Sequence, residues 1–104
     1  MLKLVLLSPG MTGRTQELKQ EKTTIGRLED NTLQIAEPSV SSHHCEVLLR
    51  GSTVVVRDLN STNGTYVNDQ RVNRAELENR TEFEIGTTTL MLIRSVARES
   101  PSAG

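Results

Sequence analysis

The sequence is poor in aromatic residues and has no excess of either charge. Its aromatic residues are Tyr66 and Phe83, and it contains no tryptophan. Proteins that hold single-stranded nucleic acid usually stack bases on aromatic side chains. Twelve Lys and Arg residues stand against 13 Asp and Glu residues, a net charge of −1. This balance is not typical of proteins that bind nucleic acid or anionic membranes, so we expect no nucleic-acid partner.

Cysteine and long apolar runs are also scarce. Cys45 is the one cysteine of the 104 residues, so no internal disulfide can form and a disulfide-bonded secreted scaffold is excluded. The apolar run Leu4–Leu7 is too short for a signal peptide or a membrane span. The length corresponds to one domain. We expect the protein to be cytoplasmic or otherwise intracellular, without membrane insertion.

Short clusters of β-branched and other apolar residues predict an all-β fold. Within one cluster Cys45 and Val47 share a face and Glu46 takes the polar one, which is typical of a half-buried antiparallel strand. The segment Ala75–Arg80 is the one stretch that favours a helical turn. The expected strands are Leu2–Leu7, Gln16–Gln20, Thr23–Ile25, Leu33–Ile35, Cys45–Arg50, Val54–Asp58, Thr65–Val67, Glu82–Ile85 and Thr88–Ser95.

Turn-forming residues separate these clusters and suggest the domain boundary. Asn63-Gly64 and Asn68-Asp69 are typical of tight turns between strands. The segment Arg98–Gly104 contains only Arg, Glu, Ser, Pro, Ala and Gly. We therefore expect a folded domain over residues 1–97 and a flexible tail, or the start of a linker, over residues 98–104. Such a domain would be tethered to a larger protein.

Three polar segments interrupt the strands, where a β-sandwich usually carries its function. They are Ile25-Gly26-Arg27, the segment from Ser39 to His44, and the segment from Asp58 to Thr65. Each lies in a predicted loop or at a strand end. The candidate functional residues are found in these segments.

Four motifs in these segments and just after them resemble the forkhead-associated (FHA) domain family. They are Gly26-Arg27, Ser41-x-x-His44, Ser61-Thr62-Asn63-Gly64 and Val67-Asn68. Their order and spacing match the family pattern, and the resemblance extends from about Leu2 to Val96. It implies a β-sandwich of about eleven mostly antiparallel strands in two sheets, with binding loops at one end. It also implies that these loops bind phosphothreonine peptides.

The residue types suit that ligand on physical grounds. A phosphothreonine carries a charge of about −1.5 to −2 and three acceptor oxygens. The planar guanidinium of an arginine pairs with phosphate through two hydrogen bonds, and small hydroxyl groups can approach the phosphate closely. Arg27, Ser41, Ser42 and Thr62 supply this set if the loops converge. The partner would then be a phosphothreonine-containing protein, which implies a Ser/Thr kinase upstream, and no cofactor is needed.

The resemblance also implies a role for each matching residue. Arg27 and Ser41 would hold the phosphate, and Ser42 would stand at a second contact position where the family often has Arg or Asn. Thr62 would touch the phosphate or the threonine methyl group, and Asn63 the ligand backbone. The loop-bracing residues would be Gly26, His44, Gly64 and Asn68. Ser39 lies in the loop that selects residues flanking the phosphothreonine.

Three other functions compete with this interpretation. The same fold could serve as a phospho-independent interaction or oligomerisation domain. The run His43-His44-Cys45 suggests a metal site, but consecutive residues entering a strand point to opposite faces, and the sequence has no other His or Cys to complete one. A hydrolase could use Ser41 or Ser42 with a His and Asp58, but the sequence lacks the Gly-x-Ser-x-Gly motif. We expect no catalytic residues and no metal.

Overall fold

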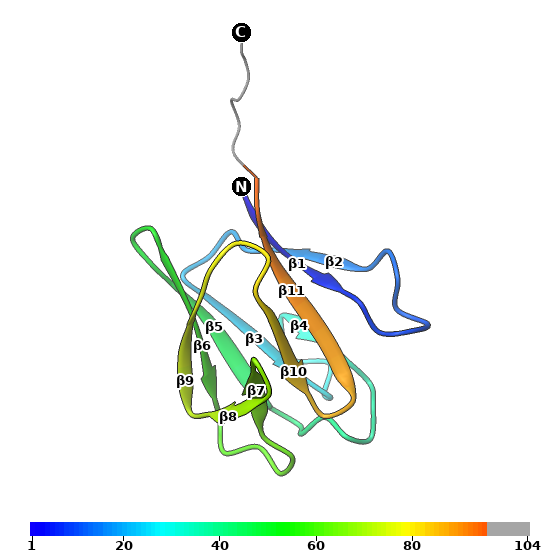
Figure 1. Cartoon of the computed structure of the whole chain (residues 1–104). Helices are drawn as coiled ribbons and strands as arrows, with labels where there is room; N and C mark the ends of the chain where they lie inside the picture. Colours follow the sequence, from blue (N-terminus) through cyan, green and yellow to red (C-terminus); the bar gives the residue numbers. More distant parts are fainter. Residues whose placement is uncertain (96–104) are drawn as a thin grey trace, which may run out of the picture.

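The computed structural model describes residues 1–95, which form eleven β-strands in two sheets (Figure 1). The strands are β1 (Leu2–Leu6), β2 (Thr15–Glu17), β3 (Lys22–Gly26), β4 (Leu33–Gln34), β5 (Cys45–Arg50), β6 (Thr53–Asp58), β7 (Thr65–Val67), β8 (Gln70–Val72), β9 (Arg74–Leu77), β10 (Glu82–Ile85) and β11 (Thr88–Arg94). The predicted all-β fold is confirmed. The tail predicted at residues 98–104 lies outside the described residues.

One sheet has six strands in the order β2-β1-β11-β10-β7-β8, and the other has five in the order β4-β3-β5-β6-β9. Every pair is antiparallel except β3 and β4. The first and last strands are neighbours, because Leu2 pairs with Arg94. Backbone hydrogen bonds between Met1 and Ser95 continue this pairing beyond the strand ends.

The core fills the space between the two sheets. Leu4, Phe83 and Leu90 point inward from the six-stranded sheet, and Ile25 and Val47 from the other. Each of these side chains is at most 1% exposed. Burial of apolar area stabilises a fold by about 25 cal/mol per Å², so this core supplies a firm frame for the loops.

The segment Ala75–Arg80, predicted as a helical turn, is a strand in its first half. β9 covers Arg74–Leu77 and pairs with β6, placing Ala75 opposite Val56 and Leu77 opposite Val54. Its burial alternates, with Leu77 turned into the core. Pairing with β6 therefore overrides the expected helical preference of three residues. The polar strand β8 was not predicted at all.

Glu46 also differs from its prediction. It lies on the outer face of β5 as expected, yet it is only 6% exposed. Its Oε2 atom forms an ion pair with Nε of Arg57, 2.9 Å away, on the residue directly opposite on β6. The cross-strand ion pair, together with its neighbours, covers the carboxylate, so this face is not simply solvated.

The connections at one end of the sandwich come from both sheets. They are the β3–β4, β4–β5 and β6–β7 loops and the β10–β11 turn, and they lie at the end opposite Met1 (Figure 1). All three segments singled out in the sequence meet there. Among residues 1–95 no helix is long and apolar enough to span a membrane.

Candidate functional site

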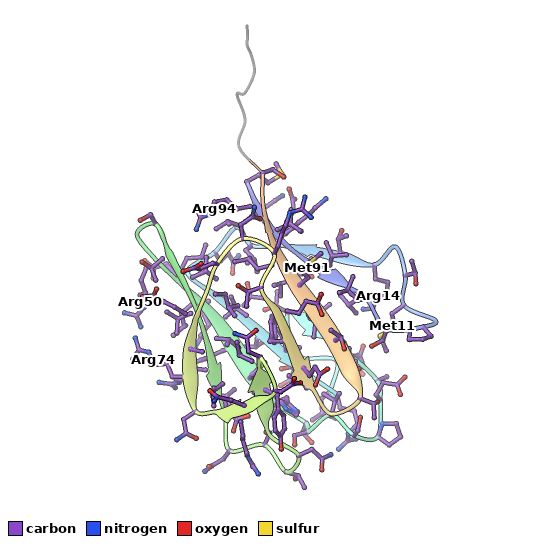
Figure 2. All side chains as sticks on the ribbon, in the orientation of Figure 1. Met11, Arg14, Arg50, Arg74, Met91 and Arg94 are labelled. Carbon is purple, nitrogen blue, oxygen red and sulfur yellow. The ribbon has the colours of Figure 1, made fainter. Side chains whose placement is uncertain are left out.

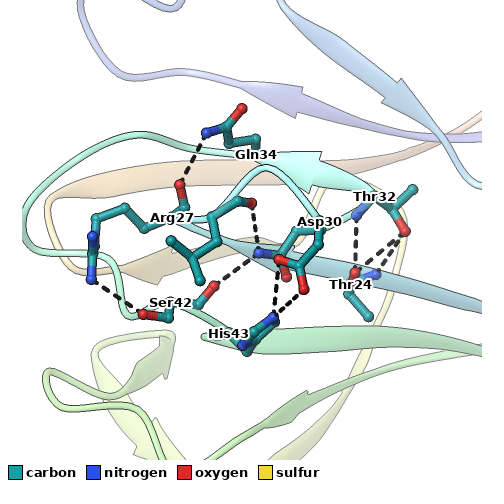
Figure 3. Close-up of polar contacts among 9 residues, drawn as sticks. Thr24, Arg27, Asp30, Thr32, Gln34, Ser42 and His43 are labelled. Carbon is teal, nitrogen blue, oxygen red and sulfur yellow. Dashed lines mark hydrogen bonds and ion pairs between the residues drawn. The ribbon is translucent and has the colours of Figure 1, made fainter.

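Arg27 is the first residue after β3 and lies over the β4–β5 loop. Its Nε donates to the carbonyl of Val40 at 3.1 Å. Its Nη2 donates to Oγ of Ser42 at 3.2 Å (Figure 3). Its backbone N–H donates to the carbonyl of Ser41 at 2.9 Å. The side chain is exposed, and a guanidinium has five N–H donors. Arg27 is therefore oriented by two hydrogen bonds and keeps further donors for a ligand.

Gly26 and Asn31 bring the β3–β4 and β4–β5 loops into backbone contact. A Cβ atom at Gly26 would lie 2.3 Å from the carbonyl oxygen of Ser42 and 2.9 Å from Cα of His43. The side-chain nitrogen of Asn31 donates to the carbonyls of Ser42 and Leu28, both at 2.8 Å (Figure 3). Only glycine fits at position 26 without moving the loop that carries Ser41 and Ser42.

His44 joins the β4–β5 loop to the β6–β7 loop from inside the protein. Its Nδ1 accepts a hydrogen bond of 3.1 Å from the backbone N–H of Ser41. The proton must therefore be on Nε2, which lies 2.8 Å from the carbonyl oxygen of Gly64 and donates to it. The ring is fully buried. His44 thus fixes the position of both loops through their backbones.

Ser41 and Thr62 join the same two loops at the surface. The backbone N–H of Thr62 donates to Oγ of Ser41 at 2.9 Å. A hydroxyl that accepts one hydrogen bond still has its own hydrogen to donate. Ser41 is half-buried and Thr62 is exposed. The Ser41 hydroxyl is thereby held in place with its hydrogen available to an anion beside Arg27.

Asp58 organises the β6–β7 loop. Its Oδ1 accepts hydrogen bonds from the hydroxyls of Ser61 at 2.6 Å and Thr65 at 2.7 Å, and its Oδ2 accepts one from the backbone N–H of Ser61. Partial burial acts to raise the pKa of Asp58, but the hydrogen bonds from Ser61 and Thr65 outweigh it and hold that pKa below its ordinary value. The loop is therefore tied to an ionised carboxylate.

Asn63 and Ser39 connect the loops to the β10–β11 turn. The side-chain amide of Asn63 donates to the carbonyl of Ser39 at 2.8 Å. Oγ of Ser39 accepts a hydrogen bond of 3.0 Å from the backbone N–H of Thr87 and would lie 2.4 Å from a Cβ at Gly86. Asn63 is exposed and keeps its carbonyl oxygen for a ligand. The Ser39 hydroxyl is already bonded within the fold.

His43, His44 and Cys45 point to different surroundings. His43 is exposed, and its Nε2 lies 2.9 Å from a carboxylate oxygen of Asp30 (Figure 3). Cys45 is buried in the core, and burial raises the pKa of its thiol. Within the described part of the chain no group of three His, Cys, Asp or Glu residues could hold a metal ion.

A hydrolase would need a base at the Ser41 hydroxyl, and neither His44 nor Asp58 supplies one. His44 uses both ring nitrogens for backbone groups, since Nδ1 faces the N–H of Ser41 rather than its hydroxyl. Asp58 is bound by Ser61 and Thr65, not by a histidine. A nucleophilic serine needs a base within hydrogen-bond reach of its hydroxyl. The arrangement is suited to holding an anion, not to attacking a substrate.

The structure brings most of the predicted residues together but not all. Arg27, Ser41, Ser42, Thr62 and Asn63 follow one another across the loops, connected by the hydrogen bonds given above. Gly64 closes the β6–β7 loop with φ of +88°. Asn68 lies apart from this group, in the β7–β8 turn, where Asn68 and Asp69 both have positive φ.

The sequence analysis did not assign two residues near the candidate site to it. Asp58 was considered only as part of a hydrolase, although the spacing Asp58-x-x-Ser61 is the signal of a side chain that bonds a backbone N–H three residues later. Arg71 was treated as part of a solvated charged face. Its guanidinium lies against Gly64, where a Cβ atom would be 2.7 Å from Arg71 Nε.

Comparison with known proteins agrees with this architecture. The sequence model of the FHA domain family matches residues 23–86, which include all of the loops described above except the Thr87 side of the β10–β11 turn. The chain is 36% identical over 90 residues to the FHA domain-containing protein FhaB of Mycobacterium tuberculosis. The match covers 86% of this chain and 58% of FhaB, so the chain spans little more than half the length of that relative.

Two solved structures have the same fold. One comes from a structural and functional analysis of phosphothreonine-dependent FHA domain interactions, with a TM-score of 0.84 and 29% identity over 91% of this chain and 97% of that chain. The other is the FhaA FHA domain complexed with the intracellular domain of Rv3910, with a TM-score of 0.81 and 30% identity over 88% of this chain and 99% of that chain.

Proposed function

The chain belongs to the FHA domain family, and on that premise we propose that it is a phosphothreonine-dependent peptide-binding module that recruits a phosphorylated partner without catalysis. The observation that carries the proposal is the position of the Ser41 hydroxyl. It is held by the N–H of Thr62 while Arg27 donates to the neighbouring Ser42. A cation and a directed hydroxyl donor thus lie next to each other at the surface, as a phosphate requires.

Each site residue has a part in this proposal. Arg27 and the hydroxyl of Ser41 hold the phosphate. Ser42 orients Arg27 through its Oγ atom and is close enough to the guanidinium to share the same phosphate. Gly26 and His44 brace the loops from beneath through the contacts described above.

The β6–β7 loop holds the rest of the peptide. Thr62 is exposed beside Ser41 and contacts the phosphothreonine side chain. Asn63, oriented by its bond to the Ser39 carbonyl, binds the peptide backbone after the phosphothreonine. Gly64 and the more distant Asn68 form turns that position this loop and the β7–β8 hairpin. Since the Ser39 hydroxyl is bonded to Thr87, Ser39 influences the flanking-residue preference mainly through the position of its backbone.

The partner is a protein phosphorylated on threonine by a Ser/Thr kinase, which places the domain in the same compartment as that kinase, inside the cell. One structural neighbour is an FHA domain in complex with an intracellular domain, and another comes from work on phosphothreonine-dependent interactions. Both support a peptide-binding role for this chain. We propose that residues 1–97 form the binding domain.

The proposal is tested with an oriented phosphothreonine peptide library, using phosphoserine and unphosphorylated libraries as controls. We expect selective retention of phosphothreonine peptides by the wild-type chain. Equal retention of the unphosphorylated library by folded protein would overturn the proposal and would favour the phospho-independent interaction domain.

Arg27→Ala provides the matching residue test. Charge-assisted hydrogen bonds are worth about 1.5–3 kcal/mol each, so we expect the affinity for a selected phosphothreonine peptide to fall by more than about tenfold. Because Arg27 is exposed, the free energy of unfolding should change by less than about 1 kcal/mol. Arg50→Ala, on the β5–β6 hairpin, removes the same charge and should leave binding unchanged; unfolding of the Arg27 variant would instead indicate a structural arginine.

A further inference from the structure

Arg71 places a second cation beside the proposed binding loops. It lies on β8 directly opposite Tyr66 on β7, and its side chain extends back along the hairpin to Gly64. A Cβ atom at Gly64 would lie 2.7 Å from Nε and 3.1 Å from Cζ of Arg71. Gly64 is buried although it is in a loop at the surface. The guanidinium therefore covers the last residue of the Ser61–Gly64 motif.

The charge of Arg71 is not neutralised within the fold. Arg14 and Arg94 donate hydrogen bonds to carbonyl groups, and Arg57 forms an ion pair with the carboxylate of Glu46. Within residues 1–95 the Arg71 guanidinium makes no hydrogen bond and no ion pair. Arg71 is also exposed. A guanidinium that is held against backbone but lacks an anionic partner is prepared for an anion from a ligand.

The contacts across the loops connect this cation to Arg27 through a series of neighbouring site residues. Arg27 contacts Ser42, Ser41 contacts Thr62, Asn63 follows Thr62, and Arg71 covers Gly64. The two cations therefore stand at the two ends of one row of site residues. A peptide that starts with its phosphate at Arg27 and runs past Asn63 reaches Arg71 a few residues later.

We propose that Arg71 recognises an anionic side chain on the C-terminal side of the phosphothreonine. This inference rests on the proposed function, because the direction of the peptide comes from the role given to Asn63. The anion is a carboxylate or a second phosphate, both of which pair with a guanidinium. Packing against Gly64 limits the motion of the Arg71 side chain before binding, which lowers the entropy cost of the contact.

The experiment is a set of titrations with phosphothreonine peptides of otherwise neutral sequence. Asp is placed singly at each of the first four residues after the phosphothreonine, and then at each of the four before it. A second series uses phosphoserine at the same places. We expect one C-terminal position at which Asp tightens binding roughly two- to fivefold, as for an exposed ion pair, and phosphoserine at least as much.

Three variants assign the preference. Arg71→Gln should abolish it, Arg71→Lys should keep part of it, and Arg50→Gln, a matched loss of charge on the β5–β6 hairpin (Figure 2), should leave it intact. If the wild type binds phosphothreonine peptides selectively but shows no preference for an anionic residue that depends on Arg71, this inference alone is overturned. Equal binding of phosphorylated and unphosphorylated peptides by the wild type would overturn both the proposed function and this inference.

Discussion

Gly26 illustrates how a residue that touches no ligand can determine a binding site. A methyl group there would meet the carbonyl of Ser42 and Cα of His43 at less than van der Waals distance. We expect Gly26→Ala to lower the free energy of unfolding by about 1–3 kcal/mol, as overpacking does, and to weaken phosphopeptide binding, because the loop of Ser41 and Ser42 must move. Urea denaturation and peptide titration measure the two effects.

Gly51→Ala is the matched control for Gly26→Ala. Gly51 has φ of +63° and open space around it, so its replacement costs about 1–2 kcal/mol of backbone strain in the β5–β6 turn. Binding should be unaffected in this variant. A Gly26→Ala protein that binds as tightly as wild type would show that the loops tolerate displacement, against our account.

At the scale of residues, local motifs were sufficient to predict most of the residues that the structure brings together in the candidate site. Arg27, Ser41, Thr62 and Asn63 were predicted because each belongs to a short motif whose residue types suit a phosphate or a peptide. Arg71 was not, because its contact with Gly64 depends on the register of the β7–β8 hairpin. No local pattern carries that information.

The β6–β7 loop behaves as one unit because Asp58 bonds three groups of Ser61 and Thr65. The pKa of Asp58 is lowered in the folded protein, so the unfolded chain binds its proton more readily. The stabilisation is therefore present above about pH 4 and is lost as the pH falls through the folded pKa. We expect the difference in unfolding free energy between wild type and Asp58→Asn to shrink below pH 4, as measured by urea denaturation across pH.

Asp69→Asn is the comparison for that measurement. Asp69 is exposed in the β7–β8 turn with φ of +65°, a conformation that Asn also tolerates. This variant therefore removes a carboxylate that has no part in the hydrogen bonds of the β6–β7 loop. The difference in unfolding free energy between Asp69→Asn and wild type should stay small at every pH. If the difference in unfolding free energy between wild type and Asp58→Asn grows as the solution becomes more acidic, the result would contradict a lowered pKa of Asp58 in the folded protein.

At the scale of elements, the central strands were predictable and two edge-region strands were not. β5 and β10 show clear apolar clusters or alternation, and they were placed to within a residue of their observed bounds. β8 is a three-residue polar strand, and β9 owes its extended form to pairing with β6. Short strands that depend on partners distant in sequence leave little signal of their own.

At the scale of the whole molecule, Met1 and the end of β11 lie at the opposite end of the sandwich from the candidate site (Figure 1). Met1 and Ser95 already close the six-stranded sheet through backbone hydrogen bonds. We expect a chain ended after Ala97 to keep the free energy of unfolding within about 0.5 kcal/mol and to bind the same peptides. A chain ended after Met91 loses three of the five residue pairs between β1 and β11 and should lose its cooperative unfolding transition.

Binding by the intact domain should depend on pH through the ligand. The second pKa of a phosphothreonine is near 6, and the dianion pairs more strongly with Arg27. We expect the affinity to fall by up to about tenfold between pH 7 and pH 5, measured by titration calorimetry. His43 is exposed and follows Ser42, which accepts a hydrogen bond from Arg27, so His43→Gln is the control. Disappearance of the pH dependence in this variant would assign it to the protein rather than to the phosphate.

The most direct test of the account is the map of amide chemical shifts in the labelled protein on addition of one phosphothreonine peptide. We predict changes confined to the loop end and the neighbouring Arg71, at residues 26–28, 39–43, 61–64 and 71, and none at the β5–β6 turn around Gly51. The unphosphorylated peptide should produce no such changes. Equal changes with both peptides, or changes centred on the outer face of either sheet, would contradict phosphothreonine recognition by these loops.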